Sequence, residues 1–118
     1  MIAVLFEVLP AAGRKEEYLE AAAALRPILE GMDGFLSVER FQSLSDPDKL
    51  LSLSFFRDED AVMAWRTRAE HRAVQAKGRG GVFSDYRLRI AQVMRDYGMH
   101  HRQSAPQDSR LVHERQDD

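Results

Sequence analysis

IAVLFEVL, residues 2–9, is the stretch that decides the fold of this chain. Successive side chains of a strand point to opposite faces, and Glu7 is the one polar residue on either face here. A strand that is apolar on both faces is covered on both faces, which is typical of a central strand. Pro10 ends the run, because proline has no N–H to donate to a neighbouring strand. We therefore expect a sheet built around Ile2–Leu9.

Three further strand-like runs follow, at Phe35–Leu44, Leu50–Phe56 and Val82–Met94. The segment SDPDK, residues 45–49, is a turn by composition, so the second and third strands are expected to form an antiparallel hairpin. Helical patterns fill the other two connections. The order strand, helix, strand, strand, helix, strand predicts a ferredoxin-like α+β domain with a four-stranded antiparallel sheet.

The first helix is expected over Arg14–Leu25, with a kink or restart at Pro27. The second is expected as one continuous helix, capped by Asp58 and ended by the glycines that follow Lys77. On a single ideal helix, Trp65 and His71 would point about 120° apart, because six residues rotate about 600°.

Both helical crossovers of such a unit are right-handed and lie on the same face of the sheet. To that face we assign Ile2, Val4, Phe6, Leu51, Leu53, Phe55, Tyr86, Leu88 and Ile90. The opposite face then shows Ala3, Leu5, Leu9, Ser52, Ser54, Phe56, Ala91 and Val93, together with Glu7, Arg87 and Arg89. A monomer would leave this second face as an apolar patch in water. We expect a homodimer, a dimeric α+β barrel in which two sheets enclose a cavity.

Composition excludes several classes of function. A net charge of −2 gives no broad basic field for nucleic acid, and KLLSLSFF (residues 49–56) lacks the pattern of RNA-recognition strands. The absence of cysteine excludes disulfides, thiol catalysis and Cys-ligated metals. No run approaches the roughly 20 apolar residues of a membrane-spanning helix, and the N-terminus lacks the basic region of a signal peptide. A cytoplasmic protein without nucleic-acid or membrane partners is predicted.

The composition changes after Asp96, where the chain becomes polar. We predict one domain over residues 1–97 and an extended or disordered tail over residues 98–118. His100, His101 and His113 lie in this tail without cysteine or an ordered carboxylate nearby, which indicates solvated side chains rather than a metal site.

Four segments resemble the antibiotic biosynthesis monooxygenase (ABM) family. They are IAVLFEVLP (2–10), GMDGF (31–35), FFRDEDAVMAWRTRAEHRAVQ (55–75) and FSDYRLRIAQV (83–93). The resemblance implies a cofactor-independent monooxygenase that acts on an electron-rich aromatic, such as a quinol or an anthrone, in a cavity of the dimeric barrel. The alternative is a non-catalytic dimer that binds a small hydrophobic molecule, for example in a stress response. Haem-degrading relatives carry an iron-ligating histidine where this chain has Gln75, and an asparagine near the end of the first strand that is missing here, so haem is disfavoured.

The chemistry implied by the resemblance needs a base, a cationic partner for the resulting anion and a flat apolar wall. The candidate catalytic residues are His71, Glu7 and Arg87, and the candidate substrate-binding residues are Trp65, Phe56, Arg89 and Tyr86. Structural roles are open for each: a core anchor for Trp65, a helix-end residue for His71, and an ion-pair network for Glu7 with the two arginines. No metal and no cofactor is expected.

Overall fold

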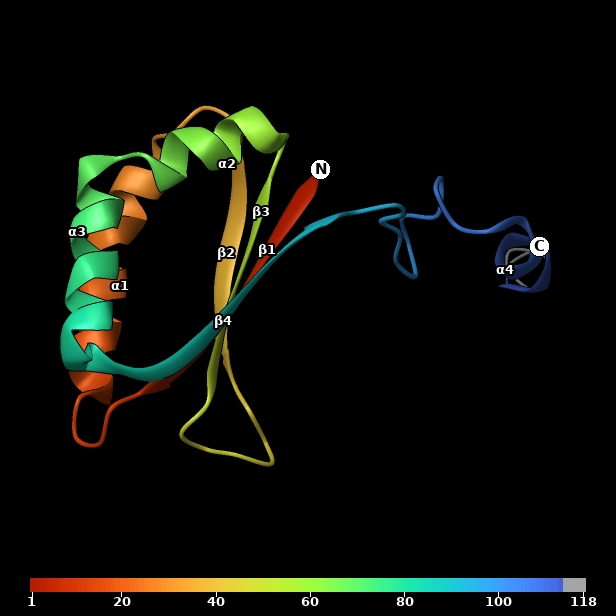
Figure 1. Cartoon of the computed structure of the whole chain (residues 1–118). Helices are drawn as coiled ribbons and strands as arrows, with labels where there is room; N and C mark the ends of the chain where they lie inside the picture. Colours follow the sequence, from red (N-terminus) through yellow and green to blue (C-terminus); the bar gives the residue numbers. More distant parts are fainter. Residues whose placement is uncertain (114–118) are drawn as a thin grey trace.

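A computed structural model describes residues 1–113 of the chain (Figure 1). The ferredoxin-like α+β fold is confirmed. Its elements are β1 (Ile2–Pro10), α1 (Lys15–Glu30), β2 (Phe35–Gln42), β3 (Leu50–Phe56), α2 (Glu59–Arg66), α3 (Ala69–Lys77), the π-helical turn η1 (Gly78–Val82), β4 (Phe83–Gln92) and α4 (Gln107–His113).

The four strands form one antiparallel sheet in the order β2-β3-β1-β4, so β1 is central as its apolar pattern predicted. Helices α1 and α3 lie side by side over one face of this sheet, and α2 crosses near one end (Figure 1). The opposite face carries no helix in the part of the chain that the structure describes. We call the two surfaces the helix face and the open face.

The register of β1 with β3 corrects the face assignment of the third strand. Residues directly opposite one another in an antiparallel pair share a face, and here Val4 pairs with Ser54 and Phe6 with Ser52. The helix face therefore receives Leu50, Ser52, Ser54 and Phe56, whereas Leu51, Leu53 and Phe55 lie on the open face. Our assignment was wrong by one residue, and a one-residue shift moves every side chain of a strand to the other face.

This register places the most deeply buried side chains of the sheet under the helices. Phe56 and Val8 are each only 1% exposed and belong to two separate core clusters. Phe56 packs with Ile2, Leu29, Val38, Ala61 and Val62, and Val8 packs with Tyr18, Ala22, Leu50 and Val82. Burying Phe56 rather than Phe55 is compatible with the small Ser54 on the same face, which is itself buried.

Helix α1 continues five residues beyond its expected end. Pro27 lies inside it without interrupting it, and it ends at Gly31, whose N–H donates to the Ile28 carbonyl at 3.2 Å while the Met32 N–H donates to the Leu29 carbonyl at 3.1 Å. A left-handed residue, Gly34 with φ of +84°, then turns the chain into β2. A Cβ at Gly34 would lie 2.6 Å from the Cβ of Ala61, so close packing also requires glycine there.

The C-terminal segment leaves the sheet and extends away from the body of the domain (Figure 1). Ser104 Oγ donates to the Asp96 carbonyl at 2.6 Å, and residues Gln107–His113 form α4. The expectation of an extended or disordered tail is therefore wrong for Gln107–His113. The end of that tail, residues 114–118, lies outside the described residues. None of the helices within residues 1–113 is long and apolar enough to cross a membrane.

The register gives a direct test with two adjacent phenylalanines. Phe56→Ala should lower the free energy of unfolding by about 3–5 kcal/mol, because it leaves a cavity in a closed core. Phe55→Ala should cost clearly less in chemical denaturation at the same protein concentration, since the Phe55 ring on the open face is only half-buried. A larger loss for Phe55→Ala that does not depend on protein concentration would contradict the register.

Candidate functional site

A cavity of about 190 Å³ lies between the helix face of the sheet and helices α1, α2 and α3. Its floor comes from all four strands and includes Val4, Phe6, Ser52 and Ile90. The walls are mostly apolar and aromatic. This cavity lies within one protomer, whereas the sequence led us to expect a chamber between the sheets of two protomers; that chamber stays a prediction.

A break in the second helical segment shapes one wall of the cavity. Thr67 ends α2, and its hydroxyl donates to the Met63 carbonyl at 2.8 Å. Arg68 is then extended, with φ of −65° and ψ of 138°, and α3 starts at Ala69. Threonine hydroxyls that bond to the preceding turn compete with the backbone and favour helix ends. The prediction of one continuous helix from Asp58 to Lys77 is therefore wrong.

The break brings Trp65 and His71 together. Their ring centroids are 4.7 Å apart with 36° between the ring planes, and both residues line the cavity. On an ideal helix the same two side chains would diverge by about 120°. The change of direction at Thr67 and Arg68 removes that divergence, so the two residues form a stacked pair at the cavity wall.

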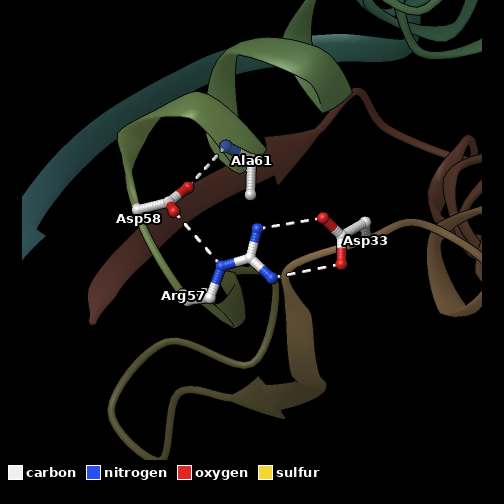
Figure 2. A network of polar contacts seen from close by, with 4 residues as sticks. All are labelled: Asp33, Arg57, Asp58 and Ala61. Atoms are coloured by element: carbon white, nitrogen blue, oxygen red, sulfur yellow. Dashed lines mark hydrogen bonds and ion pairs between the residues drawn. The ribbon is translucent and has the colours of Figure 1, made fainter.

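A polar network holds the start of α2 in place (Figure 2). Both terminal nitrogens of Arg57 donate to the carboxylate of Asp33, at 3.1 and 3.0 Å, and Arg57 Nε donates to Asp58 at 3.2 Å. Asp58 in turn accepts from the Ala61 N–H at 2.9 Å, which makes it the N-cap of α2 as predicted. Its hydrogen bond from Ala61, followed by that from Arg57, lowers the pKa of Asp58. The network links the start of α2 to the turn before β2.

His71 is partly buried, and its Nδ1 has no hydrogen-bond partner among the described residues. Burial lowers the pKa of His71 below its ordinary value of 6.5, against a smaller raising effect of a backbone hydrogen bond with Arg66. The imidazole is therefore mainly neutral at pH 7, the form that can accept a proton.

The predicted site residues divide between the two faces of the sheet. Tyr86 lines the cavity with Trp65 and His71, and its hydroxyl accepts from Arg79 at 3.1 Å. Phe56 does not line the cavity, because it is enclosed in the core; its predicted role as a flat wall is wrong for this cavity.

Glu7, Arg87 and Arg89 lie together on the open face, away from the cavity. Glu7 bonds Arg89 at 3.2 Å and also Lys49 at 3.3 Å, a partner that we did not predict. The Lys49 hydrogen bond is the largest cause that lowers the pKa of Glu7. A carboxylate with a lowered pKa is a weak proton acceptor, and this arrangement is typical of a structural ion-pair cluster.

Three cavity residues that sequence reasoning missed are Arg26, Arg40 and Arg66. They come from α1, β2 and α2, so their common location depends on the tertiary fold. One signal was present in β2, where Val38 and Arg40 alternate with residues of the open face and therefore point under the helices. No group of three or more His, Asp or Glu side chains within residues 1–113 is placed to hold a metal ion.

The sheet order β2-β3-β1-β4, with helices on one face (Figure 1), defines the class of ferredoxin-like α+β proteins. The sequence model of the antibiotic biosynthesis monooxygenase family matches residues 1–77, and the chain belongs to this family.

Two relatives in sequence support this assignment, and one solved structure supports the fold. The chain is 50% identical over 93 residues to a protein named jasmonate monooxygenase ABM from Pyricularia oryzae, a match that covers 79% of this chain but only 43% of that protein. It is 33% identical over 79 residues to YqjZ, an uncharacterized protein of Bacillus subtilis. This match covers 66% of this chain and 67% of YqjZ. The solved structure of Rv0793 from Mycobacterium tuberculosis has a TM-score of 0.74 at 13% identity, covering 82% of this chain and 98% of that one.

The lowered pKa of His71 predicts a pH dependence of stability. As the pH falls from about 7.5 to about 5.5, the unfolded chain protonates this imidazole at its ordinary pKa while the folded chain resists, so the free energy of unfolding should fall. His71→Gln should lose less stability over the same interval. Denaturant titrations at several pH values measure the difference, and the other three histidines are common to both proteins. Equal pH dependence in the two proteins would refute the burial of the His71 ring.

Proposed function

We propose that this protein is a monooxygenase that needs no prosthetic group and oxidises a small, electron-rich substrate in the cavity under the helices. The observation that carries the proposal is the neutral His71 imidazole stacked on Trp65 at the wall of a largely apolar cavity. Membership of the family and the name of the Pyricularia oryzae relative, jasmonate monooxygenase ABM, support the same class of activity.

His71 is proposed as the base. A neutral imidazole can remove the proton of a phenol or of a methylene group activated by a neighbouring carbonyl, as in a quinol or an anthrone. The resulting anion is electron-rich enough to reduce O₂ directly. For an activated methylene the reaction balances without a further reductant. One oxygen atom of O₂ becomes the oxygen of the new carbonyl, and the other leaves as water with the two hydrogens of the CH₂ group.

Trp65 and Tyr86 have supporting roles in this proposal. The indole is a flat wall on which an aromatic substrate can stack beside His71. The Tyr86 hydroxyl accepts a hydrogen bond from Arg79 and can donate its own proton to an oxygen of the substrate. The apolar and aromatic side chains that form most of the cavity lining limit water around the anion, which strengthens these interactions.

Oxygen uptake tests the proposed role of His71. Purified protein with an anthrone or a quinol should consume O₂ faster than buffer, and His71→Ala should reduce the catalysed rate by about 10²–10⁴-fold, the usual contribution of a general base. His100→Ala, in the exposed C-terminal segment, is the matched control and should keep full activity. Uptake that does not change in His71→Ala would remove His71 from the mechanism.

A binding protein without catalysis is the second candidate function. It is favoured by the separation of His71 from the carboxylate of Glu7. Among the residues that line the cavity there is one histidine and no aspartate or glutamate, so His71 is the single candidate base there. Stoichiometric binding of a small aromatic without O₂ uptake would select it. Haem binding stays disfavoured, since Gln75 lines the cavity where an iron-ligating histidine would be needed; a shift of the Soret band on adding haemin would reverse this.

We further propose that the protein acts as a homodimer in which two open faces pack together. The open face carries Leu5, Leu51, Leu53 and Phe55 around the Glu7 cluster, and no described helix covers it. An interface of the usual size buries about 1,600 Å² in total. A second copy is suited to this face because a two-fold axis would bring the same apolar row of each sheet into contact.

A charge on the open face should separate the two copies. Leu53→Asp should shift the protein from dimer to monomer in sedimentation equilibrium at micromolar concentration, because it buries an unpaired carboxylate in the interface. Met63→Asp, at an exposed position of α2, should leave the dimer intact. A wild-type protein that sediments as one chain would overturn the dimer.

A further inference from the structure

We propose that the natural substrate of this cavity is a small carboxylic acid, with its carboxylate bound by Arg40 and its apolar body lying over Phe6 toward β4. This inference names the substrate class of the site described above and rests on the proposed function for the reaction that follows binding. The binding step itself can be tested without any turnover.

The charged side chains that line the cavity are all arginines. Arg26, Arg40 and Arg66 line it, and no aspartate or glutamate is among its lining residues. Arg26 is engaged by Glu30 at 2.9 Å. Arg40 and Arg66 have no carboxylate partner within residues 1–113. A cationic cavity without an internal counter-charge favours an anionic ligand.

Arg40 also has a buried hydrogen-bond donor without an acceptor. Its Nε is buried and has no acceptor among the described residues. A buried donor without an acceptor is costly, and the cost is removed when a ligand supplies one. A carboxylate is matched to this side chain, because its two oxygens can accept two parallel N–H bonds from one guanidinium.

The register of the sheet shows why the ligand should be amphipathic. Arg40 pairs with Ser52, Ser52 with Phe6, and Phe6 with Leu88, so these four residues form one row across the helix face. The row is cationic on the edge strand β2 and apolar on β1 and β4. Leu88 and the neighbouring Ile90 are 45% and 48% exposed, although they line the cavity. An apolar group of the ligand would cover them.

The size of the cavity agrees with a small organic acid. A volume of about 190 Å³ is below the roughly 300 Å³ at which pockets for drug-sized ligands begin. The other unpartnered buried nitrogen in the cavity is His71 Nδ1. With the carboxylate on Arg40, the apolar body of the ligand extends toward the Trp65–His71 wall, where the proposed chemistry takes place.

The test is a pair of ligands that differ in charge but little in shape. In isothermal titration calorimetry under nitrogen, 1-naphthylacetate should bind the wild-type protein at least about tenfold more tightly than the neutral 1-naphthaleneacetamide. Arg40→Gln should abolish this preference and Arg40→Lys should keep part of it. Arg72→Gln, an exposed arginine of α3 that does not line the cavity, is the matched control and should behave as wild type.

Four results would overturn the proposal. They are equal affinity of the wild type for the acid and the amide, an unchanged preference in a folded Arg40→Gln variant, tighter binding of 1-naphthyl phosphate than of 1-naphthylacetate, and absence of binding of the acid at millimolar concentration. Circular dichroism of each variant shows that the fold is retained.

Failure of the substrate class and failure of the proposed function give different results. Oxygen uptake is compared for 2,5-dihydroxyphenylacetate and its methyl ester, which offer the same quinol with and without the charge. O₂ uptake with no preference for the acid would support the monooxygenase activity and contradict the carboxylate site. Charge-selective binding without any O₂ uptake would support the carboxylate site and contradict the monooxygenase activity.

Discussion

The pairing of β1 with both of its neighbours is the constraint on which the rest of this structure depends. β1 bonds β3 on one side and β4 on the other, so its register fixes which side chains of three strands lie under the helices. It places Val8 and Phe56 in closed cores and sets the row from Arg40 to Leu88 along the cavity floor. Because side chains alternate with a period of two, a shift of one residue in β3 would exchange the floor and the open face.

The second determinant is a local break between two short helices. Thr67 ends α2 by bonding back to Met63, and the extended Arg68 lets α3 start in a new direction. The two helices together are as long as one ordinary helix, but only the broken form stacks His71 on Trp65. The Arg57 network links the other end of α2 to the turn before β2 (Figure 2). The candidate catalytic pair therefore depends on backbone geometry rather than on helical spacing.

Charge is distributed unequally between the faces of the sheet. On the open face Glu7 is compensated by Arg89 and Lys49, which is the arrangement expected of a structural cluster at a partly covered surface. On the helix face the cavity holds arginines from three elements and no acid. Glu7 has its charged partners on the open face, whereas Arg40 Nε in the cavity is buried without an acceptor among the described residues. The charged residues of the two faces therefore differ in whether their polar groups have partners, and the sequence does not show this difference.

The sequence by itself determined the order of the elements, the central place of β1, the N-cap at Asp58 and the family, because these follow from local pattern, capping chemistry and motif. It also indicated Trp65, His71 and Tyr86 as candidates, and these three residues line the cavity. The tertiary structure decided the face of β3, the meeting of Trp65 with His71, and the gathering of Arg26, Arg40 and Arg66 around one cavity. These features depend on strand register and on a helix break, which bring together residues distant in the chain and have no local signature strong enough to be read from the sequence.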